Sequence, residues 1–85
     1  MSTDRELVLG TLESKLAPLI GPSMARSSIK MHSEKLGIDG DELNPEQIDA
    51  LVTAIGLAMR VFVGKEKADA LTQEILEGIG VGGSA

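Results

Sequence analysis

Glycines at positions 21, 37 and 64 divide the sequence into four segments, and in each segment apolar residues recur every three or four positions. This spacing gathers apolar side chains on one face of an α-helix, whereas a half-buried strand needs them at every second position. Glycine is common just beyond a helix end because it adopts a positive φ without a steric penalty. The pattern therefore predicts an all-α fold, a compact bundle of about four short helices.

The length of 85 residues leaves room for one domain with a small core. We expect a single helical domain over residues 3–79, followed by a flexible glycine-rich tail over residues 80–85. The sequence contains no cysteine, so neither a disulfide nor a thiolate zinc site stabilises that core. The core must therefore be stabilised by packing within the chain or by packing against a second copy. A homodimer is accordingly among the expected states.

The net charge of -5 opposes binding to nucleic acid, which draws its affinity from clustered lysine and arginine. No segment approaches the roughly 20 apolar residues that span a bilayer, and the polar start of the chain is unlike a signal peptide. We therefore expect a cytoplasmic protein that has neither nucleic acid nor a membrane as its partner.

Two helix starts are predicted from capping residues. Residues 44–47 place Asn at the cap, Pro at the first helical position and Gln three residues after the cap. Thr3 and Glu6 have the same spacing at the beginning of the first helix. The inward face of that first helix is predicted to carry Leu9, Leu12, Leu16 and Leu19.

The helix expected from residue 45 to residue 63 is apolar around most of its circumference. Such a helix is either central to its bundle or also buried against a partner. We expect Leu57 and Val61 to form an interaction surface, with Arg26 and Lys30 of the basic helix over residues 22–36 as its charged flank. The inward stripe is predicted to carry Ile48, Leu51, Val52, Ile55, Met59 and Phe62.

His32 is the only histidine, and it stands three residues before Lys35. This pair resembles the motif of histidine phosphotransfer domains, four-helix bundles in which an exposed histidine accepts a phosphoryl group and a lysine helps to neutralise it. The resemblance implies His32 as phosphoacceptor and Lys35 as the neutralising cation. Glu34 departs from it because its negative charge would repel phosphate. The other interpretation is a structural histidine that shares a face with Ala25 and Ile29.

No enzyme active site, cofactor or metal site is predicted from the remaining polar residues. The acidic run at residues 39–42, taken with Asn44 and Glu46, lacks the order of an EF-hand, and the serines of the basic helix have no base beside them. A helix-turn-helix is a further alternative, which would make the chain an acidic, DNA-associated regulator. Arg26 and Lys30 are too few to anchor a duplex.

The stretch LAPLIGPSMA at residues 16–25 is followed by a basic helix and later by RVFVG at residues 60–64. These motifs resemble small helical modules with an "LxxxIGPxA" core that occur at the ends of bacterial signalling proteins. The resemblance runs from about residue 9 to residue 79, and here Ser23 and Met24 separate the turn from Ala25. It implies a non-catalytic protein-interaction or regulatory signalling module, which is the leading prediction.

Overall fold

The computed structural model describes residues 3–79, which form four helices and two very short strands. The predicted all-α bundle is confirmed. The tail predicted over residues 80–85 lies outside the described residues. In chain order the elements are β1 (Thr3–Asp4), α1 (Arg5–Ile20), α2 (Pro22–Lys35), β2 (Glu42–Leu43), α3 (Pro45–Val63) and α4 (Lys65–Ile79).

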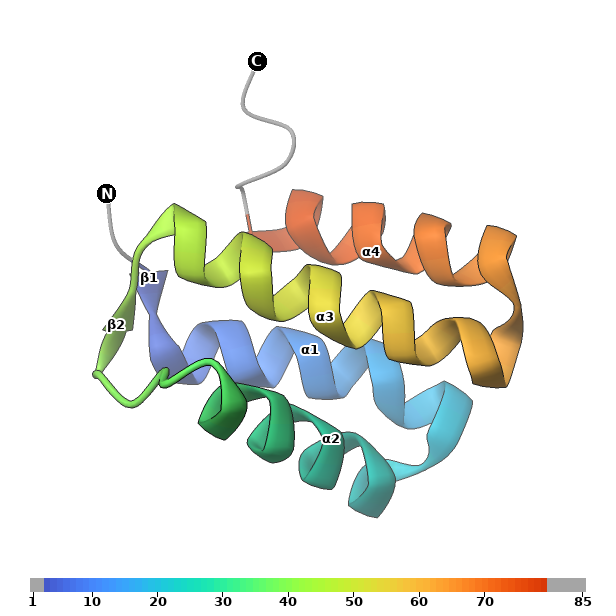
Figure 1. Cartoon of the computed structure of the whole chain (residues 1–85), viewed down its shortest axis with the longest axis horizontal. Helices are drawn as coiled ribbons and strands as arrows, with labels where there is room; N and C mark the ends of the chain where they lie inside the picture. Colours follow the sequence, from blue (N-terminus) through green and yellow to red (C-terminus); the bar gives the residue numbers. More distant parts are fainter. Residues whose placement is uncertain (1–2, 80–85) are drawn as a thin grey trace.

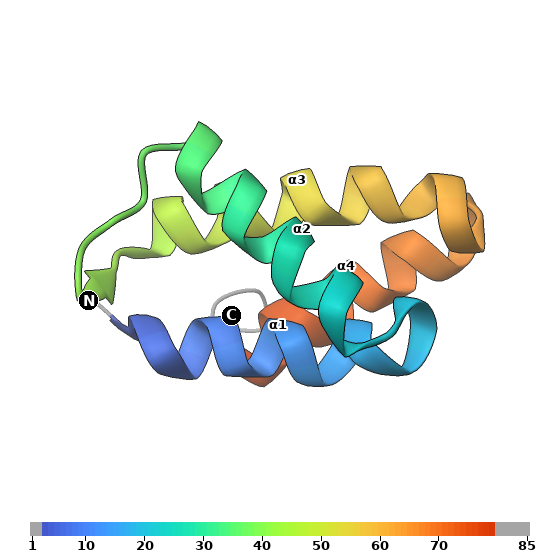
Figure 2. The ribbon, with the colours of Figure 1, turned by 90° about the horizontal axis from the view of Figure 1, so that it is seen from below.

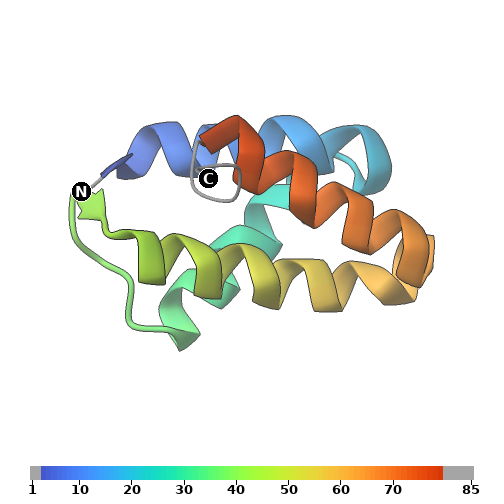
Figure 3. The same ribbon diagram turned by 90° about the horizontal axis from the view of Figure 1, so that it is seen from above.

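Helices α1 and α3 lie side by side and run in the same direction, and α2 and α4 run back along them (Figure 1). Helix α2 crosses α1 and α3 from one side, as Figure 2 shows. Helix α4 covers the opposite side (Figure 3). The chain therefore consists of two antiparallel helical hairpins, α1 with α2 and α3 with α4, packed together.

The core takes side chains from all four helices and from the connection between α2 and α3. In α1 the buried side chains are Val8, Leu12 and Leu16, while Leu9 is half-buried and Leu19 is exposed. The predicted inward face was therefore wrong at Leu19 and omitted Val8, whereas Leu9 packs against the core from a half-buried position. Apolar residues occupy both positions 8 and 9, and packing of α1 between α2 and α4 selects the side of Val8.

The inward stripe predicted for α3 is confirmed at five positions and wrong at Phe62, whose side chain is exposed. Met59, nearly one turn earlier, is the last α3 residue that the core encloses. Phe62 lies two residues before Gly64, where the chain turns into α4. Val63, about one turn after Met59, packs against the core from a half-buried position, so the inward stripe continues through Val63 and not through Phe62.

The cap predicted at residues 44–47 is confirmed. The backbone N–H of Gln47 donates to Asn44 Oδ1 at 2.8 Å, and the backbone N–H of Asn44 donates to Gln47 Oε1 at 3.0 Å. The cap predicted from Thr3 and Glu6 was wrong, because Asp4 accepts the Glu6 backbone N–H instead. Thr3 is paired with Leu43 in β1, so Asp4, the residue directly before α1, is the N-cap of that helix.

A two-residue antiparallel pair fastens the α2–α3 connection to the start of α1. Thr3 pairs with Leu43 and Asp4 pairs with Glu42, and the Arg5 backbone N–H donates to the Asp41 carbonyl at 2.8 Å. Leu43 is fully buried. This short connection therefore contributes to the core.

The three glycines that divide the sequence all have a positive φ, of 87° at Gly21, 70° at Gly37 and 89° at Gly64. An L-residue with a side chain is disfavoured in this region of backbone space. The glycines predicted to follow the first three helices are confirmed at each position, and they set the lengths of those helices.

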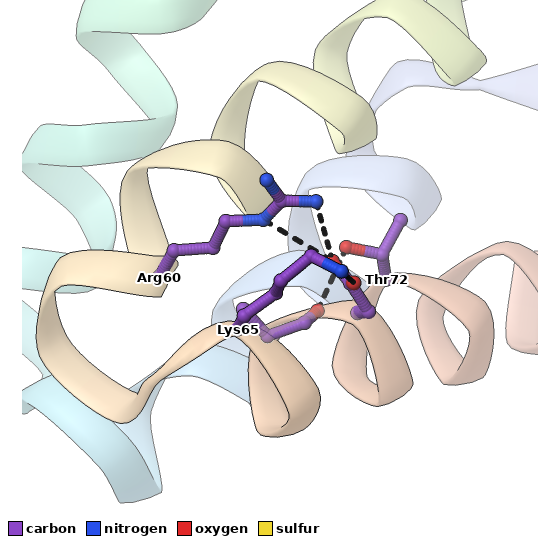
Figure 4. Close-up of polar contacts among 5 residues, drawn as sticks. Arg60, Lys65 and Thr72 are labelled. Atoms are coloured by element: carbon purple, nitrogen blue, oxygen red, sulfur yellow. Dashed lines mark hydrogen bonds and ion pairs between the residues drawn. The ribbon is translucent and has the colours of Figure 1, made fainter.

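Helices α3 and α4 approach each other closely at Gly56. A Cβ atom built there would overlap Thr72 Oγ1, which donates to the Ala68 carbonyl at 2.9 Å. Nearer the Gly64 turn, Arg60 donates through Nη2 to Asp69 Oδ1 at 3.0 Å (Figure 4). Glycine at position 56 is therefore a packing requirement of the α3–α4 hairpin.

We expect Gly56→Ala to lower the free energy of unfolding by about 1–3 kcal/mol, because the added methyl group displaces Thr72. This loss exceeds the gain in helix propensity of about 1 kcal/mol from glycine to alanine. Urea denaturation of Gly56→Ala and of the double variant Gly56→Ala/Thr72→Ala measures the loss in the free energy of unfolding. Adding Thr72→Ala should restore most of the lost stability, and a double variant no more stable than Gly56→Ala would contradict the proposed overlap.

Candidate functional site

The four residues predicted to form one interaction surface lie on two separate surfaces. Leu57 and Val61 are on the exposed side of α3. Arg26 and Lys30 line a groove between α1 and α2. The structure therefore offers two separate candidate sites.

The first is the outer face of α3, which we define as Ala50, Ala54, Leu57 and Val61. These residues follow one another at steps of four, three and four, so they form one stripe along the helix. The side chain of Leu57 is 53% exposed and that of Val61 is 85% exposed. The opposite side of the same helix is buried in the core. Helix α3 is therefore apolar both toward the core and toward solvent.

Other large apolar side chains that reach solvent do not form such a stripe. Those on α1, on α2 and at the end of α2 are separated by more than one helical turn. Single exposed apolar residues of this kind are usual on protein surfaces. Phe62, which is 55% exposed, adjoins Val61 and extends the apolar surface of α3. The scattered residues are Leu7, Leu19, Met24, Met31 and Leu36.

The second site is a groove of about 430 Å³ between α1 and α2. Its more buried lining consists of Leu9, Ile29 and Ser33. Charged side chains form the rim, and most of them are exposed, whereas Arg5 and Glu13 are half-buried. Arg26 Nε lies 3.2 Å from Glu13 Oε1, an ion pair that joins the two helices. The complete lining is Arg5, Glu6, Leu9, Gly10, Glu13, Arg26, Ile29, Lys30, Ser33 and Glu34.

Ser33 and Gly10 are groove residues that the sequence analysis did not identify. Ser33 follows Ala25 and Ile29 at steps of four, and this spacing places it on the buried side of α2. Gly10 stands inside α1, where glycine is less favourable than alanine. Both signals were in the sequence, but the groove that joins them depends on how α1 packs on α2.

His32 is half-buried, and its Nδ1 donates to the Ser28 carbonyl at 2.8 Å. This bond lies within α2 and ties the imidazole to its own helix. Lys35 is exposed at the end of the same helix. The alternative role of His32 and Lys35 in phosphotransfer stays a prediction.

Neither a metal site nor a membrane span is present in the described part of the chain. No group of three His, Cys, Asp or Glu residues among residues 3–79 is placed to hold a metal ion. None of the described helices has the length and apolar character that crossing a bilayer requires.

No protein-family model, curated protein or solved structure matches this chain. The function must therefore be inferred from the two surfaces themselves.

We expect Leu57→Ala to change the free energy of unfolding of the monomer by less than about 0.5 kcal/mol, because the side chain is mostly in water. Leu51→Ala, which truncates a fully buried leucine of the same helix, should lower it by about 2–5 kcal/mol. Urea denaturation at low micromolar concentration compares the two variants. Equal losses in the free energy of unfolding for Leu57→Ala and Leu51→Ala would mean that the outer face of α3 belongs to the core.

Proposed function

We propose that this chain is a cytoplasmic protein-interaction module without a catalytic centre, and that it forms a homodimer through the outer face of α3. The observation that carries this proposal is the exposure of Leu57 and Val61 on a helix whose other side is already buried. Apolar surface left in water favours association, and a second copy would remove it from solvent.

The outer face of α3 is complementary to itself when two copies pack antiparallel. A two-fold axis between Ile55 and Gly56 sets Ala50 opposite Val61 and Ala54 opposite Leu57. Each large side chain then meets a small one, which is how layers of a helical interface fill space without overlap. An interface of this kind uses the same residues from both copies, as two-fold symmetry requires.

Charge favours the same arrangement. If the register of the antiparallel pair is carried past α3, Glu46 comes near Lys65 of the second copy, which follows the Gly64 turn at the start of α4. Both are exposed, and the Lys65 side chain is 73% exposed. A parallel pair would instead place Glu46 beside Glu46 and Lys65 beside Lys65. Opposite charges at an interface rim select the orientation of the partners.

The interface is short, with one stripe from each copy over about three helical turns. Interfaces of this size are weak, and we expect a reversible dimer with a Kd from roughly micromolar to millimolar. Association would then respond to local concentration, as suits a regulatory module appended to a larger protein. The resemblance of residues 16–25 to modules of bacterial signalling proteins supports the same class of function.

Sedimentation velocity from about 1 µM to 1 mM tests the dimer, since this range covers the expected Kd. The sedimentation coefficient should rise from the monomer value toward the dimer value as the concentration increases. Val61→Glu should keep the chain monomeric because a carboxylate would be buried at the interface. Leu7→Glu is the matched control, since Leu7 is 58% exposed on α1. A wild-type chain that stays monomeric throughout, or dimers equally weakened by both variants, would contradict the proposal.

Charge reversal tests the antiparallel orientation. Glu46→Lys and Lys65→Glu should each weaken dimerisation, because each places like charges side by side, and the double variant should restore it. Thermal unfolding of the monomers controls for the contact between Lys65 Nζ and Asp69 Oδ2 at 4.0 Å. A double variant weaker than both single variants would rule out this pairing of charges.

A further inference from the structure

The hydroxyl group of Ser33 is buried in the α1–α2 groove without a hydrogen-bond partner. Ser33 is only 3% exposed, and its Oγ is the one buried side-chain oxygen or nitrogen left unpaired in the described chain. A serine inside a helix commonly donates to the carbonyl four residues earlier, and this bond is not formed here. An unpaired buried hydroxyl is unfavourable for folding. Ser33 lines the groove, so a rotation about its χ1 angle would turn the hydroxyl toward a ligand seated there and supply the missing partner.

Gly10 opens the groove on the side of α1, and nothing in the fold requires glycine there. A Cβ atom built at Gly10 would meet no atom within 4 Å, and its φ is not positive. Gly56 differs, because Thr72 occupies the space of its missing side chain. Glycine also allows a ligand to approach the backbone closely. Gly10 therefore fits a binding surface better than it fits the needs of folding.

The rim of the groove keeps free charges of both signs. Arg26 and Glu13 neutralise each other, whereas Arg5, Lys30, Glu6 and Glu34 enter no ion pair within the described chain. A ligand with a single charge would meet two groups of its own sign. A ligand that carries one positive and one negative charge can face a group of opposite sign at each end.

We propose that this groove binds a small zwitterion with an aliphatic body, such as a free aliphatic amino acid or a short aliphatic peptide. The carboxylate accepts from the Ser33 hydroxyl and pairs with Lys30, and the ammonium group pairs with the carboxylates of Glu6 and Glu34. The aliphatic body lies on Leu9 and Ile29 beside Gly10. The volume of about 430 Å³ falls in the range of small-molecule sites, about 300–1,000 Å³.

The binding site is separate from the proposed dimer interface, because α1 and α2 line the groove whereas the interface belongs to α3. Loss of the dimer would leave the groove intact, and loss of binding would leave the dimer intact. The two proposals can therefore fail independently.

A matched series of four probes tests the ligand chemistry. Leucine and leucyl-leucine carry both charges, 4-methylpentanoate carries only the carboxylate and 3-methylbutylamine carries only the ammonium group. Titration of the full chain, followed by the NMR amide signals of Gly10 and Ser33, should show saturable binding of a zwitterion. Removing either charged group should weaken binding by about tenfold or more, the effect of one charge-assisted hydrogen bond.

If leucine binds more tightly than leucyl-leucine, the better ligand is a free amino acid. If leucyl-leucine binds more tightly, it is a short peptide. Equal affinity for leucine and either singly charged probe would overturn the zwitterion proposal. Signals that do not saturate with any of the four probes would overturn the site itself.

Two variants distinguish a binding role from a structural one. Gly10→Leu fills the groove with a good helix former, and Ser33→Ala removes the unpaired hydroxyl, so both should keep or raise the Tm. Both should nevertheless weaken binding of the tighter probe about tenfold or more. Ser14→Leu adds the same side chain to α1 outside the groove and should leave binding unchanged. Wild-type affinity in both groove variants would overturn the assignment.

Discussion

Burial of the inner side of α3 is the interaction on which the rest of the fold depends. A chain of this size buries only about 60% of the surface that its unfolded form exposes. The sequence has no cysteine to add a disulfide. Each fully buried aliphatic side chain contributes about 1.5–3 kcal/mol, and α3 supplies more of them than any other helix. Helices α1, α2 and α4 all pack against α3.

The same helix shows why a small core leaves a surface for function. One side of α3 is covered by the bundle, and α3 and α4 lie so close that a side chain at position 56 would overlap Thr72. Within residues 3–79 no other helix covers the outer face, so Leu57 and Val61 are exposed. The apolar residues that α3 does not need for folding are therefore free to bind.

Local features of the sequence predicted the helices well. The cap at residues 44–47 and the turns at Gly21, Gly37 and Gly64 depend on neighbouring residues alone, and the structure confirms them. Pairing of Thr3 with Leu43 joins residues far apart in the chain, so no local pattern could predict it. The cap assigned to Thr3 was wrong for this reason.

The candidate sites were predictable only in part. The excess of apolar residues on α3 predicted a surface at Leu57 and Val61, and both side chains are exposed. The groove could not be foreseen, because it arises where α1 lies on α2 and combines Gly10, Ser33 and rim charges from both helices. Arg26 and Lys30 belong to that groove, although the sequence alone suggested that they flank the surface of α3.

The central claim is that α3 has two apolar sides, one buried by the fold and the other available to a second copy. An NMR dilution series of the full chain, read at the methyl groups of α3, tests this claim directly. The account predicts that the methyl signals of Ala50, Ala54, Leu57 and Val61 shift with protein concentration while those of Leu51 and Ile55 stay constant. Signals of the outer face that remain unchanged over the whole series would contradict it.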